Sequence, residues 1–169
     1  ITGYAESQED FNAVSDAILA QLGEYHRLYN VYLRYEEMEN MCTINELVDG
    51  AHRTVTVDRR IIDLLLYARQ MYDTTDGVVN VAMGSVLKLW HDCRTDGLDN
   101  PAAATLPDAA ALAEAAKHTD IQKMVIDEEN NTVTLTDPKM RLDVGAIAKG
   151  YAVEQIAREL LEHRRLGRR

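Results

Sequence analysis

The chain has few of the residues that mark several common protein classes. Its 169 residues include only two cysteines, Cys42 and Cys93, which are too few for a disulfide framework or a four-cysteine zinc site. No apolar run approaches the roughly 18 residues of a membrane-spanning helix. The first residues, ITGYAESQED, also lack the basic start and apolar stretch of an export signal. The residues themselves therefore predict neither a membrane span nor a signal.

Basic residues are also scarce. Lys and Arg number 18 against 28 Asp and Glu, which gives a formal charge of −10. Because nonspecific affinity for nucleic acid depends on clustered Lys and Arg, we expect no nucleic-acid partner. The five histidines are scattered and show neither an HExxH motif nor the Cys/His spacing of a zinc site.

The composition of the chain is typical of one folded domain. Hydrophobic residues make up 46% of the chain and charged residues 27%, which is ordinary for a globular protein of this length. Helical patterns mix with a hairpin pattern and do not alternate regularly with strands. The sequence therefore predicts an α+β fold with a mixed, largely antiparallel sheet and packed helices.

Local signals place the elements. Ser7, Asp58 and Asp108 each precede a helical pattern and are predicted N-caps. The stretch MVIDEENNTVTLTD predicts two strands around a turn at Asn130 and Asn131. The remaining expectations are a loop over residues 30–50, a strand over 54–57, a helix over 85–93, a loop over 92–107 and an extended piece over 141–144. A last helix is expected to begin at Ile147. The residues that we expect on its core-facing side are Tyr151, Val153, Ile156, Ala157 and Leu160.

The most informative segment is residues 142–153, LDVGAIAKGYAV, at a predicted junction of strand and helix. Gly145 lets the backbone approach a ligand, Asp143 supplies an acceptor, and Lys149 places a compact positive charge at the start of a helix. The segment is not a Walker loop, since Gly150 and not Ser or Thr follows the lysine. These residues alone leave two interpretations open, a pyrophosphate site and a plain turn with surface charges.

Two other segments are candidates for ligand contacts. Residues 75–84, TDGVVNVAMG, break an apolar run between two helices, although a buried connection is the ordinary interpretation of such a stretch. Tyr25 and Tyr29 continue a helical period and are typical of core. Tyr32 and Tyr35 fall past that period, so we predict that they contact ligand.

Three motifs together resemble one known family. They are YNVYLRYEEMENMCTIN at residues 29–45, TDGVVNVAMGSVLKLWHD at 75–92 and LDVGAIAKGYAV at 142–153. Their content and order are similar to the ApbE family, the FAD:protein FMN transferases once called thiamine-biosynthesis lipoproteins. The resemblance implies an ApbE-like α+β fold. It also implies that residues 1–169 form the N-terminal and central part of a flavin transferase domain, with the C-terminal part absent.

The resemblance implies an activity and a location. With Mg²⁺, such an enzyme splits the pyrophosphate of FAD, transfers FMN to a Thr or Ser hydroxyl of a target protein, and releases AMP. The implied partner is an acceptor flavoprotein such as a redox-pump subunit. The full-length protein is expected to be exported and anchored as a lipoprotein at the outer face of the cell membrane.

The same resemblance implies roles for residues of the third motif. Asp143 and Lys149 match positions that contact FAD and take part in catalysis. The backbone carbonyl of Ala146 matches a ligand of Mg²⁺. The other metal ligands of the family, an Asp and a nearby Thr or Ser, lie in the C-terminal part that is absent here.

The earlier motifs match further FAD contacts. Val78, Val79 and Asn80 match a flavin-contacting triplet in which the family usually has an acid at the third place. Tyr35 matches an aromatic FAD contact, and Tyr32 is the alternative. Two other interpretations remain: a module that binds FAD without transferring FMN, and an inactive fragment whose open sheet edge pairs with a second copy to form a homodimer.

Overall fold

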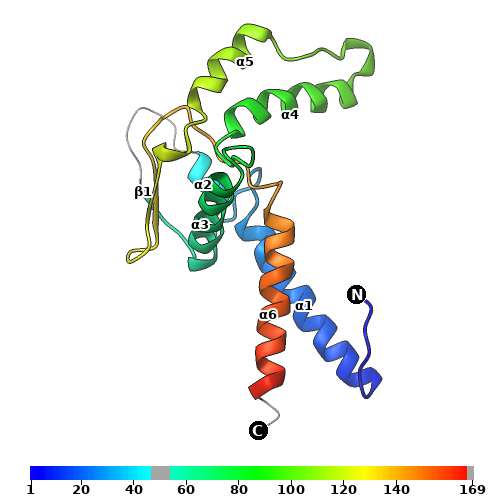
Figure 1. Ribbon diagram of the computed structural model, residues 1–169. Helices are drawn as coiled ribbons and strands as arrows, with labels where there is room; N and C mark the ends of the chain where they lie inside the picture. The colour runs from blue at the N-terminus through cyan, green and yellow to red at the C-terminus, as the bar shows by residue number, and fades with distance from the viewer. Residues whose placement is uncertain (47–53, 167–169) are drawn as a thin grey trace.

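The computed structural model, which describes residues 1–46 and 54–166, has a small antiparallel sheet at one edge and helices beside it (Figure 1). The α-helices are α1 (Gln8–Leu28), α2 (Met41–Asn45), α3 (Arg59–Thr74), α4 (Gly84–Asp99), α5 (Ala109–Ala115) and α6 (Ala148–Leu166). The strands are β1 (Thr54–Thr56), β2 (Met124–Asp127) and β3 (Thr132–Leu135). Short 3₁₀ turns cover Pro101–Ala103, Ala116–His118 and Ile121–Lys123. The predicted α+β class is confirmed.

The sheet is ordered β1-β3-β2, and both pairings are antiparallel. The predicted hairpin is confirmed, because Asp127 opposes Thr132 and the four residues between them form the turn. The Asp127 carboxylate accepts the backbone N–H groups of Glu129 and Asn130, each at 3.0 Å. Asn131 completes the turn with a φ of 51°, which asparagine tolerates better than most residues.

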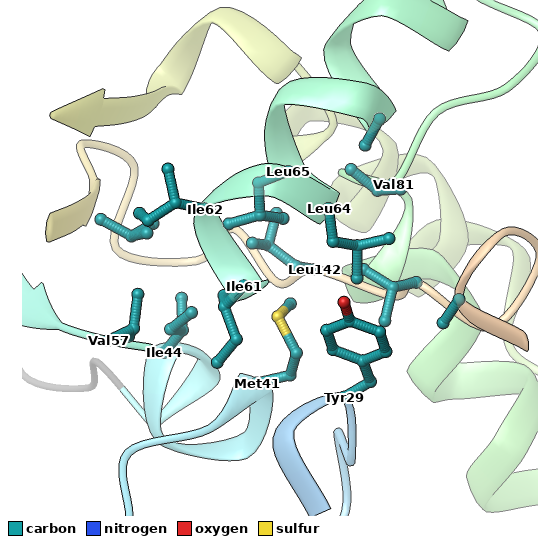
Figure 2. Packing of buried hydrophobic residues seen from close by; sticks show 14 of the residues in the cluster. Tyr29, Met41, Ile44, Val57, Ile61, Ile62, Leu64, Leu65, Val81 and Leu142 are labelled. Carbon is teal, nitrogen blue, oxygen red and sulfur yellow. The ribbon is translucent and has the colours of Figure 1, made fainter. Parts of the chain in front are cut away.

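Helix α3 supplies the centre of the hydrophobic core. Its Ile61, Leu64 and Leu65 have no exposed surface, as expected for one face of an amphipathic helix. Figure 2 shows these side chains meeting Met41 of α2 and Leu142, which comes from the segment before α6. The core therefore joins the three motifs that are far apart in the sequence.

All three predicted N-caps are confirmed. Ser7 Oγ accepts the N–H of Asp10 at 3.1 Å, at the start of α1. The carboxylate of Asp58 accepts the N–H of Arg60 at 2.8 Å and starts α3. The carboxylate of Asp108 starts α5 in the same way. These caps were predictable because each one satisfies backbone donors within three residues.

Helices α1 and α6 lie side by side and extend away from the sheet in Figure 1. The Gln21 side chain donates to the Glu159 carboxylate at 2.9 Å across this pair. On α6, Ile156 is buried as predicted, and Tyr151 and Leu160 pack partly against the core. The prediction was wrong for the other two inward positions, Val153 and Ala157, which are exposed because α6 is covered on one side only.

The predicted loop over residues 30–50 contains a short helix, α2, between residues 41 and 45. A helix of five residues is too short for a 3.6-residue period to reveal it. Its start is nevertheless marked by a capping box, in which Asn40 accepts the N–H of Thr43 and Thr43 Oγ1 accepts the N–H of Asn40. Residues 47–50 lie outside the described residues.

Helix α4 is longer than predicted and runs to Asp99, through the first half of the loop expected over residues 92–107. Its last turns are largely exposed, so no apolar period marks them. Side-chain bonds along its surface join Lys88 to Asp92 and Thr95 to the His91 carbonyl. None of the helices within residues 1–46 and 54–166 is long and apolar enough to cross a membrane.

A close backbone approach fixes the start of α4. Met83 and Arg141 form an isolated parallel bridge, and the N–H of Gly84 donates to the Arg141 carbonyl at 3.1 Å. A β-carbon on Gly84 would lie 2.6 Å from that carbonyl oxygen and 2.9 Å from the carbonyl carbon of Leu142. Only glycine fits here without a shift of the backbone.

Replacing Gly84 with alanine is expected to lower the free energy of unfolding by about 1–3 kcal/mol, because the new methyl group must displace backbone atoms. Gly23→Ala is the matched control. Gly23 is exposed on α1 and a β-carbon there meets nothing within 4 Å. That variant should gain about 0.5–1 kcal/mol of stability. Urea unfolding measures both, and a Gly84 variant as stable as the wild type would contradict the close approach.

The cap of α3 should make stability sensitive to acid. Hydrogen bonds from the Arg60 side chain hold the pKa of Asp58 below its ordinary value, and the two groups approach to 2.9 Å. A carboxylate whose folded pKa is lowered stabilises the fold above its unfolded pKa, which is about 3.9. That stabilisation is lost as the pH falls through the lower folded pKa.

In Asp58→Asn, the amide oxygen still accepts the N–H of Arg60 but the charge is gone. We therefore expect the free energy of unfolding to depend less on pH than in the wild type between about pH 5 and 2. Asp16→Asn, at an exposed position of α1, is the control for the loss of one carboxylate. Identical acid profiles for the wild type and Asp58→Asn would refute this role of the ion pair.

Candidate functional site

The segment Arg141–Asp143 is held extended between two neighbours. On one side, the Asn45 amide donates to the Leu142 carbonyl at 2.8 Å and accepts the Leu142 N–H at 2.7 Å. On the other side, the Asp143 N–H donates to the Val81 carbonyl at 2.8 Å. Asn45 is 5% exposed, so both of its bonds are made away from water. This double pairing positions the first residues of the third motif.

A tight turn then leads into α6. The Asp143 carboxylate accepts the N–H of Gly145 at 2.8 Å, and the Val144 carbonyl accepts the N–H groups of Ile147 and Ala148. Because regular helix starts only at Ala148, the Ala146 carbonyl accepts no backbone N–H from the described residues. Among the described residues, the turn thus leaves the Ala146 carbonyl oxygen without a backbone partner, next to the N-terminal end of α6.

A cleft of about 380 Å³ lies between the end of α1 and the start of α6. We call it the junction cleft. Tyr25, Tyr29 and Tyr32 border one side of it, and Asp143 and Lys149 border the other. The Tyr29 hydroxyl donates to the Arg60 carbonyl at 3.0 Å, and burial raises the pKa of this phenol, so Tyr29 is a neutral wall residue. Three predicted contacts, Tyr32, Asp143 and Lys149, therefore meet at one cleft.

A second, larger cleft of about 930 Å³ adjoins the first. We call it the α4 cleft, because α4 forms most of one wall. Val31, Tyr32 and Asp143 border both clefts, so the two clefts meet at these residues. Its polar lining includes cations as well as acids, among them Lys88, Arg94 and Arg141.

The other predicted contacts lie elsewhere. Tyr35 borders a separate hollow lined by residues 34–39, where its hydroxyl accepts the Asn30 amide at 3.5 Å. Val78 is 85% exposed and Val79 half-buried. Asn80 is tied to its own turn, since its amide donates to the Thr119 carbonyl and its oxygen accepts the Ala82 N–H, each at 2.9 Å. None of these four borders the junction cleft or the α4 cleft.

Among the side chains that the structure describes, within residues 1–46 and 54–162, no group of three or more His, Cys, Asp or Glu is placed to hold a metal ion. Cys42 and Cys93 both border the α4 cleft. Burial, helped by Glu46, raises the pKa of the Cys42 thiol, which keeps it protonated and a poor nucleophile at neutral pH.

Two residues of the site escaped the sequence analysis. The sequence predicts a loop at Asn45, and it indicates no role for Gly84 beyond its place in the segment 75–84. The capping signal at Asn40 would have revealed a helix ending at Asn45, but no local signal links Asn45 to Leu142. That contact depends on the tertiary fold.

Comparison with known proteins gives consistent results. The model of the ApbE family matches residues 2–166. The FAD:protein FMN transferase of Klebsiella pneumoniae strain 342 is 31% identical over 138 residues, which is 77% of this chain and 40% of that relative. The FAD:protein FMN transferase of Treponema pallidum strain Nichols is 35% identical over 114 residues, 64% of this chain and 30% of that relative. The chain spans less than half the length of these relatives.

Solved structures show the same fold. The ApbE protein of Thermotoga maritima matches with a TM-score of 0.70 at 25% identity, over 89% of this chain and 45% of that chain. The apo form of the Pseudomonas stutzeri flavinyl transferase ApbE matches with a TM-score of 0.72 at 20% identity, over 95% of this chain and 48% of that chain. The ApbE-like fold expected from the motifs is therefore confirmed.

Removing the Asn45 amide should loosen the site and destabilise the protein. In Asn45→Ala, the buried N–H and carbonyl of Leu142 lose their partners, and we expect unfolding to become easier by roughly 2–4 kcal/mol. Asn45→Asp still accepts the Leu142 N–H, and when the new acid is protonated its O–H can also donate to the Leu142 carbonyl, so in acidic buffers its cost should be smaller than that of Asn45→Ala. Denaturant unfolding gives both values; a loss below about 0.5 kcal/mol in Asn45→Ala would contradict this role.

Proposed function

This chain belongs to the ApbE family, and on that basis we propose that it takes part in transferring FMN from FAD to a Thr or Ser hydroxyl of an acceptor protein, with release of AMP. The relatives whose sequences match most of the chain carry the name FAD:protein FMN transferase. Since the chain spans less than half of their length, the activity, the substrate and the partner are all proposals.

One observation carries the proposal: the junction cleft brings together Tyr32, Asp143 and Lys149 at the start of α6. A diphosphate needs positive charge, which Lys149 and the N-terminal end of the α6 dipole supply. The adjoining tyrosines offer flat surfaces for the rings of a dinucleotide. Lys149 is exposed, so its ammonium group can reach a ligand from the rim of the cleft.

The chemistry is a phosphoryl transfer. The acceptor hydroxyl oxygen attacks the phosphorus of the FMN half, a new P–O bond forms, and the bond from that phosphorus to the bridging oxygen breaks. AMP leaves with the bridging oxygen, and the hydroxyl proton is lost. Such a reaction asks mainly for positioning and for cations on the phosphate oxygens. We assign the cation to Lys149, and we assign to Asp143 the acceptance of the hydroxyl proton.

Magnesium is a further part of the proposal. Hard cations prefer oxygen ligands, and the Ala146 carbonyl, which no backbone N–H of the described residues engages, is of that kind. Asp143 has a second carboxylate oxygen besides the one bonded to Gly145. When bound, Mg²⁺ would neutralise charge on the diphosphate. Its other ligands would come from the part of the relatives that this chain does not span.

The remaining assignments rest on the family resemblance. Val78, Val79, Asn80 and Tyr35 are proposed as further FAD contacts, although they lie outside both clefts here. The acceptor is proposed to be a flavoprotein such as a redox-pump subunit, and the full-length protein is proposed to be a lipoprotein at the outer face of the cell membrane. A homodimer is also proposed, and sedimentation at several concentrations tests it.

Lys149→Ala is expected to weaken FAD binding by about tenfold, since it removes a positive charge that the diphosphate needs. Asp143→Asn is expected to weaken FAD binding by about tenfold in the presence of Mg²⁺, since it removes a negatively charged oxygen that would help to hold the cation. Arg158→Ala is the matched control, because it removes a positive charge from the exposed side of the same helix. Titration with FAD, with and without Mg²⁺, followed by calorimetry and flavin fluorescence, measures the affinities. Unchanged affinity in both site variants would remove this assignment.

Transfer is tested separately by incubating the chain with FAD, Mg²⁺ and a Thr-containing acceptor protein. The expected product is an acceptor whose mass has increased by one FMN, with AMP released in equal amount. FAD that binds but labels no acceptor would identify a binding module in place of a transferase.

A further inference from the structure

An aromatic pair stands where the two clefts meet. The rings of Tyr32 and His91 are stacked, with centroids 4.7 Å apart and planes inclined by 24°. Tyr32 comes from the segment after α1, and His91 comes from the middle of α4. Tyr32 borders both clefts and is 61% exposed, whereas His91 borders the α4 cleft and is half-buried. One face of the tyrosine ring is therefore covered and the other is open.

The segment that carries Tyr32 is itself held in place. The Asn30 carboxamide oxygen accepts the backbone N–H groups of Tyr32 at 2.9 Å and of Leu33 at 2.8 Å. The Asn40 amide donates to the Leu33 carbonyl at 2.8 Å. The backbone of Tyr32 is thus fixed by polar contacts, and its exposed ring contacts His91.

Arg94 supports the orientation of the His91 ring. A guanidinium nitrogen of Arg94 lies 2.7 Å from His91 Nδ1. Because Arg94 lies one turn further along α4, this contact holds the ring against its own helix.

We propose that His91, oriented by Arg94, is a positioning residue that holds the Tyr32 ring as a platform on which an aromatic ring of FAD stacks. This inference rests on the proposed function, because it concerns the same substrate. It adds His91 of α4 to the proposed FAD site. His91 lies in the second motif, but the family resemblance assigns it no role. It also predicts which face of Tyr32 the substrate uses.

The geometry admits a ligand ring on one side only. At 4.7 Å, the space between Tyr32 and His91 is filled by the two rings, and no third ring fits there. The exposed face of Tyr32 is free, and Asp143 borders the same two clefts. A dinucleotide with a ring on Tyr32 can therefore place its diphosphate near the start of α6. Rings stack on tyrosine without a need for particular hydrogen bonds, so both the adenine and the flavin are candidates.

The test compares FAD dissociation constants of single and double variants. Tyr32→Leu should weaken FAD binding about tenfold, because the platform is lost. His91→Gln keeps a polar side chain but removes the supporting ring, and about a threefold to tenfold loss is expected. His91→Phe restores a ring at that place and should bind FAD within about twofold of the wild type. A merely structural role of His91 would not be rescued by phenylalanine.

A double-mutant cycle separates cooperation from independent effects. If His91 acts through Tyr32, the variant carrying both Tyr32→Leu and His91→Gln should bind FAD no more weakly than Tyr32→Leu alone. Leu33→Ala is the control, because Leu33 is exposed beside Tyr32 and borders neither cleft. Thermal unfolding of every variant shows that the fold is retained. Parallel titrations with AMP and with FMN show which ring stacks, since only that half should respond to Tyr32→Leu.

The outcomes are distinguishable. Wild-type affinity in His91→Gln, or additive losses in the double variant, would overturn the inference while leaving the proposed function intact, provided that Lys149→Ala still weakens binding. Failure of the folded wild-type chain to bind FAD would overturn the proposed function and the inference together. Weak binding by His91→Phe equal to that of His91→Gln would show that stacking is not the role of His91.

Discussion

The double hydrogen bond between the Asn45 side chain and the backbone of Leu142 is the constraint on which the rest of the site depends. It fixes the segment before α6 against α2, while Gly84 lets α4 approach the same segment from the other side. Leu142 itself points into the core beside α3 (Figure 2). Backbone pairing, core packing and the site therefore depend on one short segment, which ends at Asp143.

This arrangement explains why the clefts lie where they do. Helices α1 and α6 pack together over part of their length, and the chain leaves α1 just where α6 begins. The gap left there is the junction cleft, and the start of α4 opens the second cleft across Tyr32 and Asp143. Apolar packing builds the walls, and the polar groups lie at the rim where water can still solvate them. The site is thus a product of helix packing at the end of the core.

Features that depend on near neighbours could be predicted from the sequence, and features that depend on distant ones could not. The caps at Ser7 and Asp58 and the turn before Asn131 are determined within a few residues, and all were confirmed. Likewise, Asp143 and Lys149 were expected together because they lie in one motif. The pairing of Asn45 with Leu142 and the stack of Tyr32 on His91 join separate elements, and no local sequence pattern predicts either contact. Tyr32 borders the two clefts and Tyr35 does not. This difference depends on the path of the loop in the folded structure, so the sequence could not predict it.

The bond between Asn45 and Leu142 also determines when the site can form during synthesis. Its partners are 97 positions apart, and the hydroxyl contact between β1 and β3 spans 80 positions. At translation rates of about 5–20 residues per second, Asn45 leaves the ribosome roughly 5–20 s before Leu142. For that interval, the core residues of α1, α2 and α3 lack Leu142 and the start of α6 as neighbours. Folding of this site is therefore a late event that the last motif completes.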